Sequence, residues 1–277
     1  RRVGTDMAVR LEGAIACVTG GGRGIGKATA EALAARGAKV FIGDIDLEEA
    51  RKVAAAIGPS AFAHPLDVAN PASFSAFVAA AEAHGPVSLM VNNAGIMRTG
   101  AFAEQSPETQ QREIAINLGG VVTGMRLVLP GMLARGHGHI VNVASMAGKM
   151  SVPGAAVYTA TKFGVASLSR AVRAEINGSG VTITTILPAA VRTDLTSGLD
   201  IRGVPASAPE DVARAIIASC RHGRSEVTLP HGLGLIGLVE QAFPERVGEF
   251  VKRTLGAQKR ITADTEQARA YQKRTAR

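Results

Sequence analysis

The sequence predicts an α/β fold, a doubly wound seven-stranded parallel sheet with helices on both faces. Short β-branched or apolar runs alternate with longer segments of helical periodicity, which is the pattern of repeated βαβ units. The composition, 46% hydrophobic and 19% charged over 277 residues, is that of a globular protein with a large core. The seven expected strands cover residues 14–19, 39–44, 61–66, 89–92, 139–144, 182–187 and 226–229.

Helices are expected between these strands. The segment 26–36 carries Ala and Leu at helical spacing and ends at Gly37, a residue type that readily adopts the left-handed conformation of a helix terminus. Two further helix starts show a capping pair, an N-cap residue and an acidic residue three positions later. The side chains of such a pair accept hydrogen bonds from free backbone amides at the helix start. These pairs are Asp46 with Glu49, and Ser207 with Glu210.

The chain shows no repeat of fixed period and no low-complexity linker before about residue 256, so a single domain over 1–277 is expected. Its core covers about 10–230, followed by a helical extension over 231–260 and a basic polar tail over 261–277. The extension is open to four interpretations: a lid, a subunit interface, a membrane-surface contact, or packing on the chain's own core. Its apolar stripe comprises Leu235, Val239, Phe243, Val247, Phe250, Val251 and Leu255.

The net charge of +8 raises the question of a nucleic-acid partner. From Glu245 to Arg277 there are nine Lys and Arg against four Asp and Glu, which accounts for +5 of that charge. The sequence has no Trp and only 4% aromatic residues, so the platforms on which single-stranded bases stack are scarce. The basic charge therefore indicates a solvated tail, and no nucleic-acid partner is predicted.

The two cysteines, Cys17 and Cys220, are too few for a disulfide framework. No run approaches the roughly 18 uninterrupted apolar residues of a spanning helix, and residues 1–11 lack the apolar core of a signal peptide. We therefore expect a cytoplasmic protein without a membrane span. No metal site is predicted.

A glycine-rich turn, Thr19 to Gly26, follows the first strand and opens the first helix. Such a turn lets the backbone approach a pyrophosphate, and the free amides and dipole of the helix favour the negative charge. A tight turn without a ligand would share this pattern. The expected cofactor contacts in the turn are Gly20, Arg23, Gly24, Ile25 and Gly26.

Asp44 ends the second strand, where a carboxylate can accept hydrogen bonds from the adenosine ribose. It would also repel a 2′-phosphate, so the sequence favours NAD over NADP. Arg23 keeps NADP open as an alternative, because a guanidinium near the turn can pair with that phosphate. Together the turn and Asp44 predict a Rossmann-type dinucleotide site.

A candidate catalytic set combines Ser145, Tyr158 and Lys162. Tyr158 and Lys162 are four residues apart in a helical pattern, which puts them on one face. A nearby ammonium favours the phenolate and would bring the pKa of Tyr158 toward neutrality. Ser145 follows the strand 139–144, at the edge where open α/β sheets bind ligands. The alternatives are a half-buried tyrosine, a surface lysine and a helix cap.

On these motifs the sequence resembles the classical short-chain dehydrogenase/reductase family over roughly residues 10–230. The matching segments are the glycine turn, Asp67, the run Asn92 to Gly95, Asn117, Ser145, Tyr158 and Lys162. One departure is Ala189, where the family usually has glycine after Pro188.

The resemblance implies roles for these and neighbouring residues. Asp67 and Val68 would contact the adenine, and Asn93 and Ala94 would line the cofactor. Asn117 would anchor a proton-relay water, and Lys162 would also hold the nicotinamide ribose. The remaining implied cofactor contacts, to the nicotinamide carboxamide, are Val191 and Thr193. Homodimers or homotetramers are common in the family.

The function expected is hydride transfer between NAD and a secondary alcohol or ketone. Ser145 would orient the substrate oxygen and Tyr158 would give or take its proton. An NADP-dependent carbonyl or ketoacyl reductase is one alternative, and a catalytically silent dinucleotide-binding scaffold is another. Apolar residues near the catalytic pair predict a largely apolar substrate. They are Ala147, Met150, Val152, Val157, Leu195 and Leu199.

Overall fold

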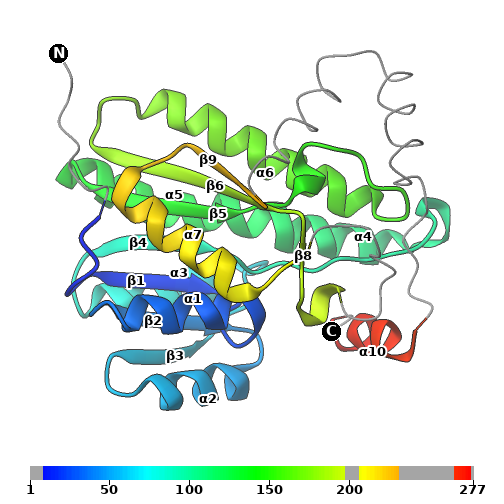
Figure 1. Ribbon diagram of the computed structural model, residues 1–277, viewed down its shortest axis with the longest axis horizontal. Coiled ribbons are helices and arrows are strands. Elements are labelled where there is room, and N and C mark those ends of the chain that lie inside the picture. The colour runs from blue at the N-terminus through cyan, green and yellow to red at the C-terminus, as the bar shows by residue number, and fades with distance from the viewer. Residues whose placement is uncertain (1–8, 197–205, 231–264, 276–277) are drawn as a thin grey trace.

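The computed structural model describes residues 9–196, 206–230 and 265–275 (Figure 1). A seven-stranded sheet has the order β3-β2-β1-β4-β5-β6-β9, and every neighbouring pair is parallel. The predicted sheet is confirmed, with strand ends shifted by at most two residues. The strands are β1 (Ile15–Thr19), β2 (Lys39–Asp44), β3 (Ala61–Pro65), β4 (Val87–Asn92), β5 (Gly138–Val143), β6 (Val181–Pro188) and β9 (Glu226–Leu229). A separate two-stranded ladder joins β7 (Ala190–Val191) to β8 (Ala206–Ser207).

Helices cover both faces of this sheet, as predicted (Figure 1). They are α1 (Gly24–Ala34), α2 (Leu47–Ile57), α3 (Pro71–Glu82), α4 (Pro107–Ile114), α5 (Gly120–Arg135), α6 (Ala156–Glu175) and α7 (Pro209–His222). One core cluster joins α3, α5 and α6 to the sheet, and a second joins α1, α2 and α7 to the opposite face. Strand β1 supplies both clusters alternately, with Cys17 in the first and Val18 in the second. Burial on both faces explains why the strands read as uninterrupted apolar runs.

The strand order reverses between β1 and β4, which creates a crevice at their carboxyl ends. The last residue of β1, Thr19, ties the two strands together there. Its hydroxyl oxygen accepts hydrogen bonds from the backbone N–H groups of Asn93 and Ala94, both at 3.0 Å. The glycine-rich turn and the segment after β4 are therefore held side by side at the crevice.

The continuous helical run Pro107–Arg135 comprises α4, a π-helical turn (Ala115–Gly119) and α5. Its 29 residues include an 18-residue stretch with a mean hydropathy of 1.4, which makes it the one helix among those described that is long and apolar enough to cross a membrane. However, Val121, Met125, Val128 and Met132 of α5 pack in the core that also holds strand residues. This packing is that of a core helix.

The helix caps match the predictions in part. Asp46 caps α2, because its carboxylate accepts a hydrogen bond from the Glu49 N–H at 3.4 Å. The predicted Ser207 cap is wrong by one position: α7 begins at Pro209, and Ala208 N–H donates to the Asp211 carboxylate at 2.7 Å. Proline fits the first helical position, where its fixed φ and missing N–H carry no cost.

The C-terminal part of the chain differs from the prediction. The extension 231–260, with its apolar stripe, lies outside the described residues. Within the predicted polar tail, the structure has a helix, α10 (Glu266–Arg274), with Ala268 and Tyr271 buried. These two residues lie three apart on one helix face, whereas Glu266 and Arg269 are exposed. A short amphipathic helix therefore packs where composition alone predicted a solvated tail.

Candidate active site

The glycine-rich turn between β1 and α1 is closely packed. Gly20 has a φ of 64°, and a Cβ on Gly26 would lie 2.0 Å from the Gly20 carbonyl oxygen, so a side chain there would block the turn. The Asn93 side-chain amide donates to the carbonyls of Thr19 and Gly20 at 2.9 and 3.1 Å. The side chain of the N-cap residue of α1, Arg23, makes no capping hydrogen bond. These first-turn amides fit the pyrophosphate of a dinucleotide.

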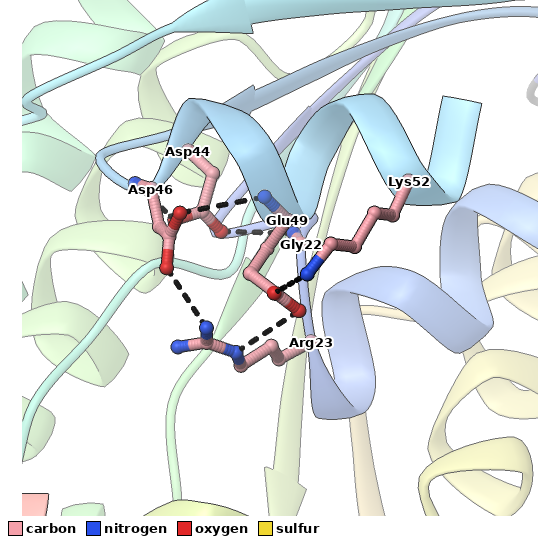
Figure 2. Close-up of polar contacts among 6 residues, drawn as sticks. All are labelled: Gly22, Arg23, Asp44, Asp46, Glu49 and Lys52. Carbon is pink, nitrogen blue, oxygen red and sulfur yellow. Dashed lines mark hydrogen bonds and ion pairs between the residues drawn. The ribbon is translucent and has the colours of Figure 1, made fainter. Parts of the chain in front are cut away.

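Asp44 lies beside this turn, at the carboxyl end of β2 (Figure 2). One carboxylate oxygen accepts from the Gly22 N–H at 2.8 Å, and the other accepts from the Asp46 N–H at 3.0 Å. Two backbone donors thus fix the carboxylate at the edge of the crevice. Its contact with the ribose hydroxyls stays a prediction.

Arg23, the residue that kept NADP open, is paired with two carboxylates (Figure 2). Its Nη2 is 2.8 Å from Asp46 Oδ2, and its Nε is 3.4 Å from Glu49 Oε2. Glu49 also pairs with Lys52 at 2.6 Å. Hydrogen bonds and charges from Glu49 and Asp46 outweigh partial burial and raise the pKa of Arg23. The guanidinium charge is therefore neutralised by neighbours on the protein.

Asp67 follows β3 and forms the next part of the crevice. One carboxylate oxygen accepts from the Ala69 N–H at 3.0 Å, and the other lies 3.2 Å from both terminal nitrogens of Arg112. Arg112 comes from α4, and sequence reasoning missed it because nothing in its local pattern sets it apart from a surface residue. The structure brings it to the same cavity as Asp67 and Val68.

Ser145, Tyr158 and Lys162 meet at the carboxyl edge of β5. Ser145 begins a short 3₁₀ turn (Met146–Gly148), and its oxygen accepts from the Ala147 N–H at 3.1 Å. Tyr158 and Lys162 share one face of α6, with the Lys162 Nζ 5.5 Å from the centre of the tyrosine ring. That Nζ also donates to the Val143 carbonyl at 3.0 Å. The predicted helical juxtaposition of the pair is thus present.

Burial dominates the protonation of this pair, which corrects the prediction of a near-neutral tyrosine. Desolvation raises the pKa of Tyr158 well above its ordinary value, and hydrogen bonding with Ser145 only partly opposes it. Desolvation also lowers the pKa of Lys162 to about 8, against an attraction from Glu113. Tyr158 is therefore a protonated phenol at neutral pH in the protein without ligands.

Asn117 occupies the π-helical turn and is fully buried. Its Oδ1 accepts from the Ile96 N–H at 2.8 Å, and its Nδ2 donates to the Ile96 carbonyl at 2.8 Å and to Thr161 Oγ1 at 3.2 Å. The side chain thus braces the segment after β4 and does not line the cavity. Its implied water-anchoring role stays a prediction.

A cavity of about 1180 Å³ joins these parts. Small-molecule pockets typically measure roughly 300–1,000 Å³, so this one can hold a cofactor and a substrate together. Of the predicted site residues, only Gly26 and Asn117 do not line it; Val157 does not line it either, and Leu199 lies outside the described residues. The residues toward the catalytic pair are mainly apolar. They include the predicted Ala147, Met150, Val152 and Leu195, and the unpredicted Met97, Tyr271 and Thr275.

Glu113, on α4, is a fully buried carboxyl close enough to interact electrostatically with Tyr158 and Lys162. Its Oε1 accepts from the Arg98 N–H at 2.9 Å, while Glu113 Oε2 and Arg98 Nε have no hydrogen-bond partner in the described part of the chain. Desolvation outweighs the attraction of Arg98 and Lys162, and raises the pKa of Glu113 to about 7. This group therefore couples stability to pH.

The Glu113→Gln variant is expected to be about as stable as the parent at pH 4.5 and more stable by about 2–3 kcal/mol at pH 8. In the parent, the Glu113 carboxyl loses its proton near pH 4.5 in the unfolded chain and near pH 7 in the folded protein. The free energy of unfolding of the parent therefore falls as pH rises across this window, whereas that of the Gln variant does not. Urea unfolding of both proteins from pH 4.5 to 8 measures the difference. Parallel pH dependences would contradict it.

A glycine-rich turn lies at the switch point of a parallel sheet, where open α/β folds bind dinucleotides, and beside it lies a buried Tyr–Lys pair, residue types used in acid/base catalysis. This arrangement is that of a Rossmann-fold oxidoreductase. The family model described as short chain dehydrogenase matches residues 14–201. The chain belongs to the short-chain dehydrogenase/reductase family, as the resemblance predicts.

Curated relatives include 2,5-dichloro-2,5-cyclohexadiene-1,4-diol dehydrogenase of Sphingobium indicum, 38% identical over 70% of this chain and 79% of that protein. Another is 3-alpha-(or 20-beta)-hydroxysteroid dehydrogenase of Mycobacterium bovis, 39% identical over 69% and 74%. A solved relative is 3-ketoacyl-(acyl-carrier-protein) reductase from Brucella melitensis complexed with NADH. It is 32% identical, covers 80% of this chain and 98% of its own, and has a TM-score of 0.76.

Proposed function

We propose that this protein is an NAD-dependent dehydrogenase that interconverts a secondary alcohol and a ketone. The observation that carries the proposal is one cavity that brings the glycine turn and Asp44 together with Ser145, Tyr158 and Lys162. An intact catalytic set in that cavity argues against a silent scaffold. An absorbance assay of nicotinamide oxidation over a panel of ketones tests it, and the absence of turnover with every ketone would overturn it.

Each catalytic side chain has a task that its surroundings suit. When bound, the nicotinamide supplies or accepts the hydride. In the reductive direction, Ser145 Oγ hydrogen-bonds the substrate oxygen, and Tyr158 Oη gives its proton to that oxygen as negative charge develops there. Lys162 holds the nicotinamide ribose and keeps positive charge beside Tyr158. A buried, protonated Tyr158 suits the role of proton donor at neutral pH.

Three features support NAD over NADP. Asp44 presents a carboxylate where the ribose hydroxyls would lie, and a 2′-phosphate would be repelled by it. Asp46 and Glu49 occupy the guanidinium of Arg23, so it is not available to neutralise that phosphate. Two solved relatives are described as complexes with NADH and with NAD; the second, a short chain dehydrogenase/reductase from Burkholderia phymatum, is 26% identical with a TM-score of 0.78.

The parent protein is expected to use NAD with a kcat/KM at least tenfold (~1.4 kcal/mol) above that for NADP. Asp44→Ala should narrow this preference, because the repulsion of the 2′-phosphate and the hydrogen bonds to the ribose are both lost. Steady-state kinetics with both cofactors measure the change. Glu31→Ala, which removes an exposed carboxylate from α1, is the control and should leave the preference intact. A parent that prefers NADP would refute this assignment of Asp44.

The substrate proposed is a largely apolar cyclic alcohol or ketone. The walls near Tyr158 are formed by Met97, Ala147, Met150, Val152 and Leu195, and such walls favour an apolar body with one reacting oxygen. The names of the relatives that act on a cyclohexadienediol and on hydroxysteroids support the same class.

We further propose a cytoplasmic homo-oligomer. Both cysteines are buried free thiols, which suits a reducing compartment. Ile114, Val122 and Leu133 are exposed apolar residues on the helical run Pro107–Arg135, which is the kind of surface that a subunit contact covers. Light scattering coupled to gel filtration tests the assembly, and a mass equal to the 28.5 kDa chain would refute it.

A further inference from the structure

We propose that Tyr271 of α10 is a specificity-determining residue whose ring packs against the body of the substrate. This inference deepens the proposed function, since it concerns the substrate end of the same cavity. Tyr271 is only 9% exposed, yet it lines that cavity together with Thr275. Both residues come from a segment that composition alone assigned to solvent.

The helix α10 is fastened to the loop after β4 by three consecutive residues of that loop. The Met97 N–H donates to the Tyr271 hydroxyl oxygen at 3.3 Å, and the Arg98 guanidinium donates to the Gln272 carbonyl. The Gln272 side-chain amide donates to Thr99 Oγ1 at 2.7 Å. These three hydrogen bonds involve the Tyr271 hydroxyl, the Gln272 backbone carbonyl and the Gln272 side-chain amide. Together they hold the helix in its position and its rotation about its own axis.

The loop after β4 is itself held in place by buried side chains of α4 and the π-helical turn. Arg98 is 7% exposed, and its backbone N–H donates to the buried carboxyl of Glu113 at 2.9 Å. Asn117 bonds both backbone groups of Ile96 in the same loop. The support for α10 thus reaches α4 and the π-helical turn, so Tyr271 is held by the folded core.

Tyr271 also lies on the catalytic side of the cavity. Its hydroxyl bonds Met97, which packs in a small apolar cluster with Ala147, Ala155 and Tyr158. Leu195 packs against that cluster from the 3₁₀ turn Asp194–Thr196, and α10 contacts this turn. Tyr271 is near enough to contribute to the raised pKa of Tyr158. A substrate that presents its oxygen to Tyr158 therefore has the Tyr271 ring beside its body.

An aromatic wall is expected to select by the size and shape of the substrate. A ring buries a large apolar area with few rotatable bonds, so a cyclic substrate gains contact that a small acyclic one cannot reach. The predicted signature is a loss of affinity that grows with substrate size, while cofactor affinity stays constant. A purely structural role would lower affinity for all ligands together.

The test is calorimetric binding of 2-decalone and of acetone to the full chain, with NAD present so that no ketone is reduced. Tyr271→Ala should weaken 2-decalone binding by about tenfold and change acetone binding by less than about twofold. Tyr271→Phe keeps the ring and should stay within about twofold of the parent for both. Arg269→Ala, on the exposed side of α10, is the matched control.

Because Tyr271→Ala removes a buried anchor, a second variant guards against loss of α10 packing. Tyr271→Trp enlarges the side chain that forms this wall. It should weaken the binding of 2-decalone several-fold and leave the binding of acetone and of NAD unchanged. Equal losses for both ketones in the Ala and Trp variants, unchanged 2-decalone binding in both, or a parent that does not bind 2-decalone would overturn the proposal. A parent that binds 2-decalone but reduces neither it nor any other ketone of the panel with NADH would refute the proposed reaction and leave the Tyr271 contact standing.

Discussion

The Tyr158→Phe variant is expected to lose turnover by about 10³-fold while it keeps its fold and its affinity for NAD. The substitution removes only the hydroxyl that moves a proton at the substrate oxygen, and general acid/base groups of this kind contribute roughly 10²–10⁴-fold. The ring stays in its buried place between Met97, Ala147 and Ala155, so packing is preserved. Single-turnover and steady-state rates with the best ketone measure the loss.

NAD binding and thermal unfolding of the same variant serve as its controls. Both should match the parent, because the Lys162 Nζ keeps its bond to the Val143 carbonyl without help from the tyrosine hydroxyl. Residual turnover within tenfold of the parent would remove Tyr158 from the acid/base role. The proton would then have to come from another group in the cavity.

Lys162→Met is expected to reduce both turnover and NAD affinity, each by at least about tenfold. Met retains a long apolar side chain for the buried site but removes the ammonium, and with it the proposed contact to the ribose and the positive charge beside Tyr158. Calorimetric titration of NAD, together with kinetics, separates the two effects.

The control for this variant is Lys39→Met, an exposed lysine at the start of β2, which should change neither quantity. A Lys162→Met protein that lost turnover but bound NAD as tightly as the parent would show that the side chain acts on Tyr158 alone. The ribose contact would then have to be abandoned.

The sheet was predictable because parallel strands buried on both faces need continuous apolar runs, and such runs stand out from helical periodicity. The same holds for the glycine turn, where only glycine fits at position 26 because the Gly20 carbonyl oxygen lies so close. Tyr158 and Lys162 were predictable because a spacing of four residues fixes a shared helix face. In each case a local pattern carries the geometry.

Other features depend on contacts that no local pattern encodes. The raised pKa of Tyr158 comes from burial, which depends on every element packed around it. Asn117 hydrogen-bonds the Ile96 backbone from a π-helical turn, and no local sequence pattern predicts that turn. The composition of the C-terminal segment gave no sign of α10, since Ala268 and Tyr271 are the only buried residues among those whose burial the structure describes there.

The fastening of α10 to the loop after β4 has a consequence for the order in which the protein matures during synthesis. The residues joined by the Met97–Tyr271 and Arg98–Gln272 bonds are 174 positions apart, whereas all seven strands of the sheet lie before residue 230. Contacts of such long sequence separation form late, and chains fold from the N-terminus as they emerge. In the nascent chain we therefore expect the sheet and the glycine turn to form before the Tyr271 wall, so the proposed discrimination between substrates would be acquired after the fold.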